Sequence, residues 1–302
     1  MSGQQFEELS IGTAAVDEFA RLPRLPALFE RRAARMATLG DDHPMAGFLR
    51  LVGEIFKAQG LACAKGEAVS PPSPDAMERA AGHGMPVLSP ESWTPTASYR
   101  EALRFIAANI ARDGLPDPAV DVLTNLGNAG KEHLDHLAEI YLTHAVTPPW
   151  QGDMLFVAAA LQVEFARLAA RIDAAALKPL DAAGLCPVCG SPPVAGVVVA
   201  DDAYGRRYLT CGLCSTSWHH VRVSCIVCGE EGKVAYHGIE GDSGLAKAET
   251  CDTCKNYSKL FYQAKEMAVE ALCDDLATLS LDLLVSNAGW KRHAPNPLVL
   301  AF

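Results

Sequence analysis

Cys186-Pro-Val-Cys189 opens a run of four Cys-x-x-Cys pairs that continues with Cys211-Gly-Leu-Cys214, Cys225-Ile-Val-Cys228 and Cys251-Asp-Thr-Cys254. The two-residue spacing within a pair lets one tight turn point both sulfurs at the same atom. Two such turns complete a tetrahedral set of four sulfurs, which suits zinc or a single iron ion. The eight thiols therefore predict two four-cysteine metal sites.

The spacing between the pairs predicts a duplicated module. There are 21 residues between Cys189 and Cys211, and 22 between Cys228 and Cys251. Such similar gaps favour a sequential assignment, in which the first two pairs form one site and the last two pairs form the other. An interleaved assignment, first pair with third and second pair with fourth, stays open on spacing alone.

Each gap also carries the signals of a β-hairpin. Residues 194–200 form a β-branched run and residues 206–210 a return strand, while residues 233–237 form a strand before a glycine-rich loop. Gly190 and Gly229 directly follow the first cysteine pair of their modules. A glycine there permits a positive φ and a close approach of the backbone to the sulfurs. We therefore expect each module to consist of a cysteine turn, a β-hairpin and a second cysteine turn.

Four disulfides are the alternative use of eight cysteines. Disulfide-rich chains are typically small and secreted, whereas this chain has 302 residues and opens with MSGQQFEELS, which lacks the apolar stretch of a signal peptide. It also has no apolar run of transmembrane length. We therefore expect a soluble cytoplasmic protein with metal-bound thiolates. Cys63 and Cys273 stand alone in helical patterns and are expected to be small buried apolar residues.

The chain before the cysteine pairs reads as helical. Apolar periodicity predicts helices over 45–61 and 154–172, the second apolar on most sides and therefore buried. Another helix is expected to begin at the capping box formed by Ser98 and Glu101. Residues 64–96, rich in proline, serine and glycine, are expected to form a long loop. After the last cysteine pair, one more helix is predicted by the stripe Val269, Leu272, Leu276, Leu279 and Leu283.

These patterns define an α+β multidomain chain. We expect an all-α domain over residues 1–183, followed by two tandem modules of the rubredoxin-like or zinc-ribbon-like kind over 184–222 and 223–262. A C-terminal helix and tail complete the chain over 263–302.

Two histidine-containing stretches are further candidates for a role at a metal site. His219 and His220 follow a cysteine pair and could donate to a sulfur, although an ordinary strand surface is the favoured interpretation. His133 and His136 are three residues apart on a predicted helix, which is not the His-Glu-x-x-His spacing of a catalytic zinc site. No stretch resembles a phosphate loop, a nucleotide-binding fingerprint or a nucleophile elbow. The sequence therefore predicts a protein that is not an enzyme.

Further residues around the cysteines form a recognisable pattern, namely Gly190-Ser191, Arg207-Tyr208-Leu209, Trp218-His219, Val221-Arg222-Val223, Lys247-Ala248-Glu249, Tyr257, Val269-Glu270-Ala271, Asp274-Asp275-Leu276-Ala277 and Asn296-Pro297. Weaker matches precede them at Phe29, Arg32, Arg35, Leu39, His43-Pro44 and Gln59. Together with the four intact cysteine pairs, this pattern resembles the FdhE family, the accessory proteins of respiratory formate dehydrogenase. The resemblance spans most of the chain and is most specific in its C-terminal half.

The resemblance implies a cytoplasmic assembly factor that acts on the catalytic subunit of formate dehydrogenase and is absent from the finished enzyme. It also implies two rubredoxin-like sites, each holding one mononuclear iron ion, with zinc as the alternative. The ligands would be Cys186, Cys189, Cys211, Cys214, Cys225, Cys228, Cys251 and Cys254. We further expect one cysteine turn, that of Cys225 and Cys228, to face a groove against the helical domain.

Two other functions fit the cysteine pattern less well. A rubredoxin-type electron carrier would use two iron sites but would leave the long helical domain unexplained. A zinc-ribbon module could bind nucleic acid through a small patch of Arg206, Arg207, Arg222 and Trp218. The formal net charge of −10 opposes this second function, because nucleic-acid binders present a basic face. We therefore expect neither a nucleic-acid partner nor membrane insertion; the oligomeric state stays open.

Overall fold

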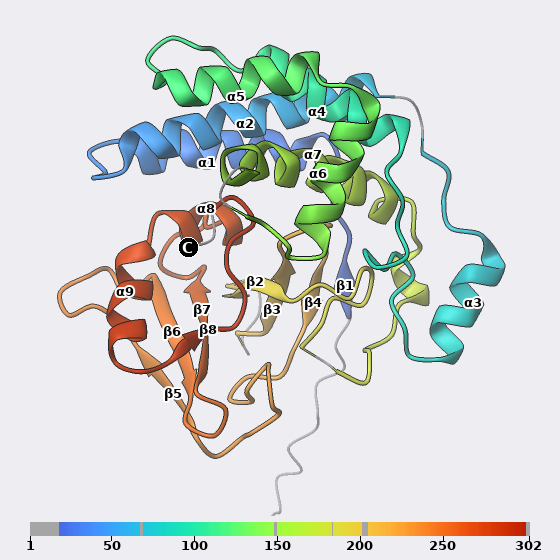
Figure 1. Cartoon of the computed structure of the whole chain (residues 1–302). Helices are drawn as coiled ribbons and strands as arrows, with labels where there is room; N and C mark the ends of the chain where they lie inside the picture. The colour runs from blue at the N-terminus through green and yellow to red at the C-terminus, as the bar shows by residue number, and fades with distance from the viewer. Residues whose placement is uncertain (1–17, 67–68, 148–149, 183, 201–204, 300–302) are drawn as a thin grey trace, which may run out of the picture.

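The computed structural model describes residues 18–66, 69–147, 150–182, 184–200 and 205–299. A layer of helices covers one side of a twisted sheet, and two short C-terminal helices lie at the edge between them (Figure 1). The helices of the first layer are α1 (Ala27–Gly40), α2 (Ala46–Lys65), α3 (Pro74–Gly82), α4 (Ala97–Asn109), α5 (Asp117–Asn128), α6 (Lys131–Leu142) and α7 (Gln151–Ala169). The structure thus confirms a helical N-terminal region followed by a β-sheet region.

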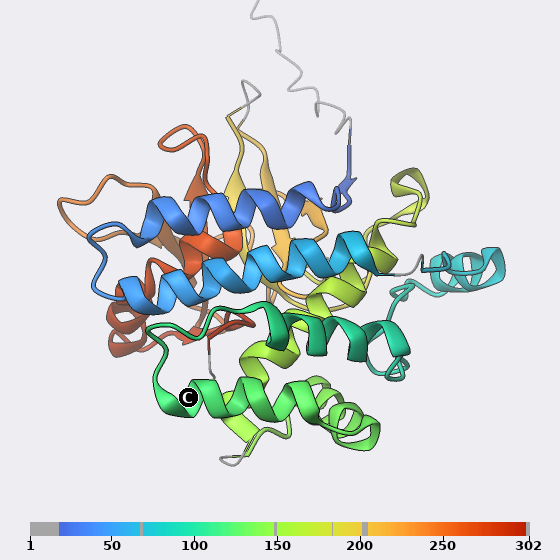
Figure 2. The same cartoon turned by 90° about the horizontal axis from the view of Figure 1, so that it is seen from above.

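Helix α7 is the centre of the helical layer. Helices α2, α4, α5 and α6 all pack against it, and most of its residues are buried, as its nearly uninterrupted apolar sequence predicts. Helix α1 lies along α2, and α3 stands apart from the other helices (Figure 2).

Two details of the helical layer differ from the sequence prediction. The cap of α4 is Thr96 rather than Ser98, because the Thr96 hydroxyl accepts a hydrogen bond from the Tyr99 amide at 3.0 Å. The expected loop over 64–96 contains α3, whose first turn is capped by Ser73 and carries proline at its first position. Both differences come from local capping chemistry that apolar periodicity does not report.

The strands form one sheet in the order β1-β4-β3-β2-β7-β6-β5, with β8 beside β7, over the described residues. They are β1 (Ala20–Arg21), β2 (Pro193–Val198), β3 (Arg207–Cys211), β4 (Ser217–His219), β5 (Val234–His237), β6 (Ala246–Cys251), β7 (Asn256–Tyr262) and β8 (Lys291–Arg292). The two predicted hairpins are confirmed as β2–β3 and β5–β6, each antiparallel. Strands β2 and β7 pair in parallel and join the two modules into one sheet.

The predicted C-terminal helix is two helices, α8 (Ala271–Leu276) and α9 (Leu279–Asn287). The helix is interrupted at Thr278. The carbonyl and the hydroxyl of Thr278 both accept hydrogen bonds from the amine of Lys259. Lys259 also binds the carbonyl of Asp275 at 2.7 Å and so satisfies the end of α8. The expected single stripe is therefore wrong, and Leu283 is 68% exposed.

Among the described helices, none is both long enough and apolar enough to cross a membrane.

Candidate metal centres

The eight paired cysteines form two groups of four. One group contains Cys186, Cys189, Cys211 and Cys214, and the other contains Cys225, Cys228, Cys251 and Cys254. Within each group, all the sulfurs lie within 4.8 Å of one another. The structure thus pairs neighbouring turns, and the interleaved assignment is wrong. We call the two groups site one and site two.

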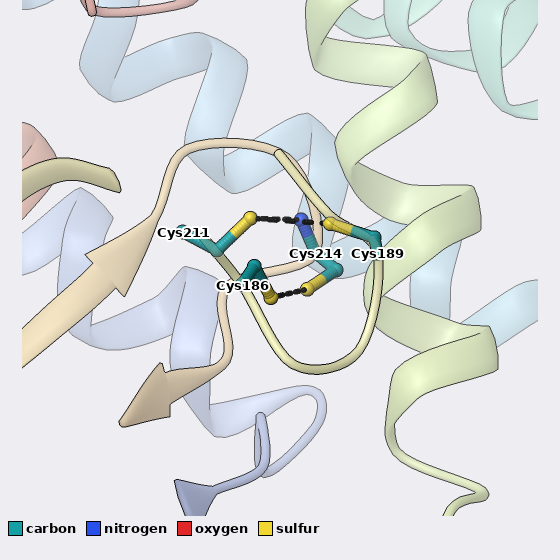
Figure 3. A group of neighbouring side chains, drawn as sticks. All are labelled: Cys186, Cys189, Cys211 and Cys214. Carbon is teal, nitrogen blue, oxygen red and sulfur yellow. Dashed lines mark hydrogen bonds between the residues drawn. The ribbon is translucent and has the colours of Figure 1, made fainter. Parts of the chain in front are cut away.

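The sulfur separations fit a single ion in each site. In site one, the sulfurs of Cys186 and Cys214 are 3.5 Å apart and those of Cys189 and Cys211 are 3.4 Å apart (Figure 3). In site two, the two corresponding separations are both 3.7 Å. A tetrahedral ion with metal–sulfur bonds of about 2.3 Å requires sulfurs about 3.8 Å apart. Both groups are therefore shaped to hold one zinc or iron ion.

The turns of the two sites have the same backbone conformation. Gly190 and Gly229 both have φ of 75°, as the sequence predicted, and their amides donate to the carbonyls of the first cysteine of each turn at 2.8 and 3.0 Å. Ser215 and Lys255, which follow the second turn of each module, both adopt a positive φ. This repeated geometry supports duplication of one module.

Backbone amides point at the sulfurs. The sulfur of Cys211 accepts from the amides of Leu213 and Cys214 at 3.3 and 3.4 Å. In site two, the sulfur of Cys225 accepts from the amide of Val227 at 3.4 Å. Such hydrogen bonds stabilise a thiolate relative to a thiol, and the thiolate is the form that binds metal.

The two sites differ in burial. All four cysteines of site one are buried, and they belong to the same apolar cluster as the helices. In site two, Cys228 is exposed and Cys254 is half-buried. Site one therefore lies in the core of the protein, whereas site two lies at its surface.

Burial makes site one depend on a cation. Burial raises the pKa of Cys186 and Cys214 well above the ordinary value of a thiol. Burial also acts to raise the pKa of Cys189, but hydrogen bonds from the neighbouring thiols outweigh it and lower that pKa. Burial disfavours the charged form of these thiols, and a bound cation would favour their ionisation inside the core. In site two, burial raises the pKa of Cys225 to about 12.

Side chains from the helices hold the loops of site one. Gln162 of α7 donates to the carbonyl of Gly212 at 2.8 Å, and Gly212 lies between two of the ligand cysteines. Arg32 of α1, which is fully buried, donates to the hydroxyl of Ser215 at 3.1 Å and to the carboxylate of Glu270 at 2.7 Å. Site one is therefore fixed from the helical layer.

A set of buried ion pairs surrounds the sites and was not predicted from the sequence. Arg207 of β3 binds Glu249 of β6, so that one charged pair joins the two modules. Arg35 of α1 binds Asp274 of α8 at 2.6 Å, which ties the helical layer to the C-terminal segment. A signal was present, because these charged residues belong to the pattern shared with the FdhE family. Arg207 had been considered only for an exposed basic patch, whereas its side chain is buried.

The histidines of both stretches contact side chains other than the cysteines. The ring of His219 packs edge-on against Tyr208, and Nδ1 of His220 lies 2.7 Å from the guanidinium of Arg207. His133 and His136 both contact the ring of Trp150. Neither pair belongs to a metal-binding group among the described residues.

The comparisons with known proteins cover nearly the whole chain. Three family models match, described as the N-terminal part of FdhE over residues 18–182, its central domain over 185–222 and its C-terminal domain over 223–299. The "Protein FdhE homolog" of Rhizobium meliloti (strain 1021) is 33% identical over 298 residues, which cover 97% of this chain and 96% of the relative. "Protein FdhE" of Escherichia coli O127:H6 (strain E2348/69 / EPEC) is 33% identical over 92% of this chain and 89% of its own.

A solved structure has the same fold. The crystal structure of the FdhE protein from Pseudomonas aeruginosa superposes with a TM-score of 0.83 at 31% identity, covering 93% of this chain and 98% of that one. The family models, the relatives and the shared fold together show that the chain belongs to the FdhE family.

Proposed function

We propose that this protein is a cytoplasmic assembly factor for respiratory formate dehydrogenase and that it binds the catalytic subunit of that enzyme. One observation carries the proposal: a full-length match to the FdhE family accompanied by both four-cysteine groups in ion-binding geometry. The protein itself catalyses no reaction in this proposal. Its role is to bring the client to an active state.

The eight paired cysteines are the proposed metal ligands. We propose one mononuclear iron ion in each site, with zinc as the alternative. An iron ion held by four thiolates can exchange one electron, whereas zinc can only stabilise the fold. The chain's own part is the same for either ion: two turns supply four thiolates, and backbone amides hold their charge.

Elemental analysis tests the metal part of the proposal. Protein purified without oxygen should contain two metal ions per chain, and iron should give a red ferric form on exposure to air. It should contain no acid-labile sulfide, because mononuclear sites have none. One metal per chain, or labile sulfide, would exclude two mononuclear sites.

Gene deletion and complementation test the function. A strain that lacks this protein should still make the formate dehydrogenase polypeptides but should lack active respiratory enzyme, and the intact gene should restore activity. A pull-down with the catalytic subunit as bait should recover this chain. Normal activity in the deletion strain would reject the proposed function.

A further inference from the structure

A cavity of about 650 Å³ lies between the helical layer and site one, and it is open to solvent on one side. Its walls come from residues in five parts of the chain, within 84–91, 141–155, 180–194, 212–213 and 294–299. Cys189 of site one contributes to the wall. We expected one cysteine turn to face a groove against the helical domain; the turn at this cavity is that of Cys189 and not, as expected, that of Cys225 and Cys228.

The cavity is lined mainly by apolar side chains. Its deeper walls are formed by Met154, Leu155, Leu185, Val194 and Leu213. Met85 and Val146, which also line it, are 58% and 36% exposed. Scattered exposed apolar residues are ordinary, but apolar residues at the entrance of an apolar cavity mark a binding surface. The volume lies within the range of about 300–1,000 Å³ that ligand pockets have.

At Gly190, the absence of a side chain lets the first turn of site one pack closely against the cavity wall. Gly190 has a positive φ, and a Cβ added there would lie 3.0 Å from the ring of Pro86. The turn of site one can therefore approach the 84–91 segment closely without a side chain between them.

The charges at the cavity are all negative. Glu91 and Asp181 line it and are exposed, and neither forms an ion pair with a described residue. Among the described lining residues, none is a lysine or an arginine. Tyr141 and His144 also line the cavity. An occupant with apolar and positively charged groups would match this lining.

The C-terminal segment of the chain forms part of the cavity wall. Residues 294–299 lie along one wall, and their side chains alternate between buried and more exposed positions. Leu298 is fully buried in the shared core, and Pro297 lies against Gly212, where an added Cβ would meet the proline ring at 2.7 Å. A peptide segment can thus pack directly against the turns of site one.

We propose that this cavity binds an extended peptide segment of a partner protein that carries apolar side chains next to a lysine or arginine. The apolar side chains would enter between α7 and the turn of site one, and the positive charge would lie at Glu91 and Asp181. The proposal goes beyond the function above, because it defines a binding site by its chemistry and holds for any partner with such a segment.

Fluorescence anisotropy with two synthetic peptides tests the proposal on the metal-loaded full chain. One labelled peptide has four leucines flanked by two arginines, and its matched partner has glutamates in place of the arginines. The arginine peptide should bind at least about tenfold more tightly at low salt, and added salt should reduce this difference. Equal binding of the two peptides, or binding of neither, would overturn the proposal.

Paired variants locate the site. The double variant Glu91→Lys with Asp181→Lys should reverse the preference between the two peptides. The double variant Glu101→Lys with Asp121→Lys changes the net charge equally on exposed positions of α4 and α5, outside the cavity, and should leave the preference unchanged. An equal effect of the two double variants would overturn the proposal. If the double variant Glu91→Lys with Asp181→Lys fails to fold, the difference in affinity of the wild-type chain for the two peptides still tests the proposal.

A third variant tests the apolar part. Val146→Trp adds bulk at the entrance and should weaken binding of the arginine peptide about tenfold while circular dichroism and metal content stay unchanged. Unchanged peptide binding in this variant would overturn the proposal. So would a cavity that takes a small apolar dye but no peptide, because it would then be a small-molecule site.

Discussion

Sites one and two have the same local structure but differ in their burial within the fold. Each is built from two Cys-x-x-Cys turns with the same positive φ after the first turn and similar sulfur separations. Site one lies inside the apolar cluster formed with the helices, whereas site two exposes Cys228 at the surface of the sheet. The same ligand motif thus serves two positions in the fold.

The difference shows how burial assigns different roles to copies of one module. A buried four-cysteine group must be loaded for the surrounding core to close, because four thiolates without a cation are unstable there. An exposed group can lose or exchange its ion while the rest of the chain stays folded. We infer that site one is part of the stability of the whole chain and that site two is a local feature.

The largest expected effect is that of losing one ligand in each site. Cys189→Ser should unfold site one and much of the helical packing on it, since a structural site contributes on the order of 10 kcal/mol. Cys228→Ser should leave the helical signal and the metal of site one in place. Circular dichroism and metal content of the two variants measure this. Equal loss of helical signal would contradict the comparison.

The sequence alone predicts a different result for Cys189→Ser, namely that only its own module unfolds. The proposed division into a helical domain over 1–183 and modules over 184–222 and 223–262 leads to that expectation. The shared apolar cluster favours wider unfolding instead. The same variant therefore tests whether the helical domain is stable by itself.

The next largest effect concerns Arg32, which connects α1 to the loop after site one. Arg32→Met leaves the buried carboxylate of Glu270 without its cation and should lower the free energy of unfolding by about 3–5 kcal/mol. Lys57→Met, which removes an exposed pair with Glu54, is the matched control and should cost less than about 1 kcal/mol. Chemical denaturation measures both. Similar losses in the free energy of unfolding for the two variants would show that the buried ion pair contributes no more to stability than the exposed one.

The pH dependence of these variants gives a second measurement. Burial acts to raise the pKa of Glu270, but the charge and the hydrogen bond of Arg32, together with hydrogen bonds from Cys273, outweigh it and lower that pKa. The ion pair therefore stabilises the fold above about pH 4.3, the ordinary pKa of glutamate, and this contribution is lost as the pH falls through the lowered value. In Arg32→Met the carboxyl can protonate, so the deficit in stability should shrink as the pH falls toward 4. A deficit that is constant with pH would contradict the assignment.

A smaller effect is expected for Gln162, which joins α7 to site one. Gln162→Leu leaves the carbonyl of Gly212 and the amide of Gln59 each without one partner, which should cost about 1–3 kcal/mol. Metal should also leave site one faster, while the release from site two stays unchanged. Faster release from both sites would mean that the two sites are coupled.

The smallest effect concerns Val223, two residues before the first cysteine of site two. It is exposed and has φ of 62°, a conformation that β-branched residues avoid. Val223→Gly should therefore raise the stability of the second module by about 0.5–1 kcal/mol, whereas Val223→Ala keeps a Cβ and should gain less. Thermal unfolding compares them; an equal gain from both would exclude relief of backbone strain.

The cysteine spacing predicted the two groups and the hairpins, because a two-residue turn and a β-branched run are local signals. The resemblance carried by Arg207, Glu249 and Glu270 predicted the family. Burial of site one could not be predicted, since it depends on contacts of Gln162 and Arg32 with loops about 50 and 180 residues away. The parallel pairing of β2 with β7 is equally non-local, and neither spacing nor periodicity reports it.

Metal release measures the central claim most directly. When the fully loaded chain is mixed with a strong chelator and followed by native mass spectrometry, a species with one metal should accumulate. Site two should empty at least about tenfold faster than site one, since Cys228 is exposed and Cys254 is half-buried, whereas all four cysteines of site one are buried. Cys228→Ser should abolish the fast phase and keep the slow one. Loss of both metals in one step, or a fast phase that survives in Cys228→Ser, would contradict the account.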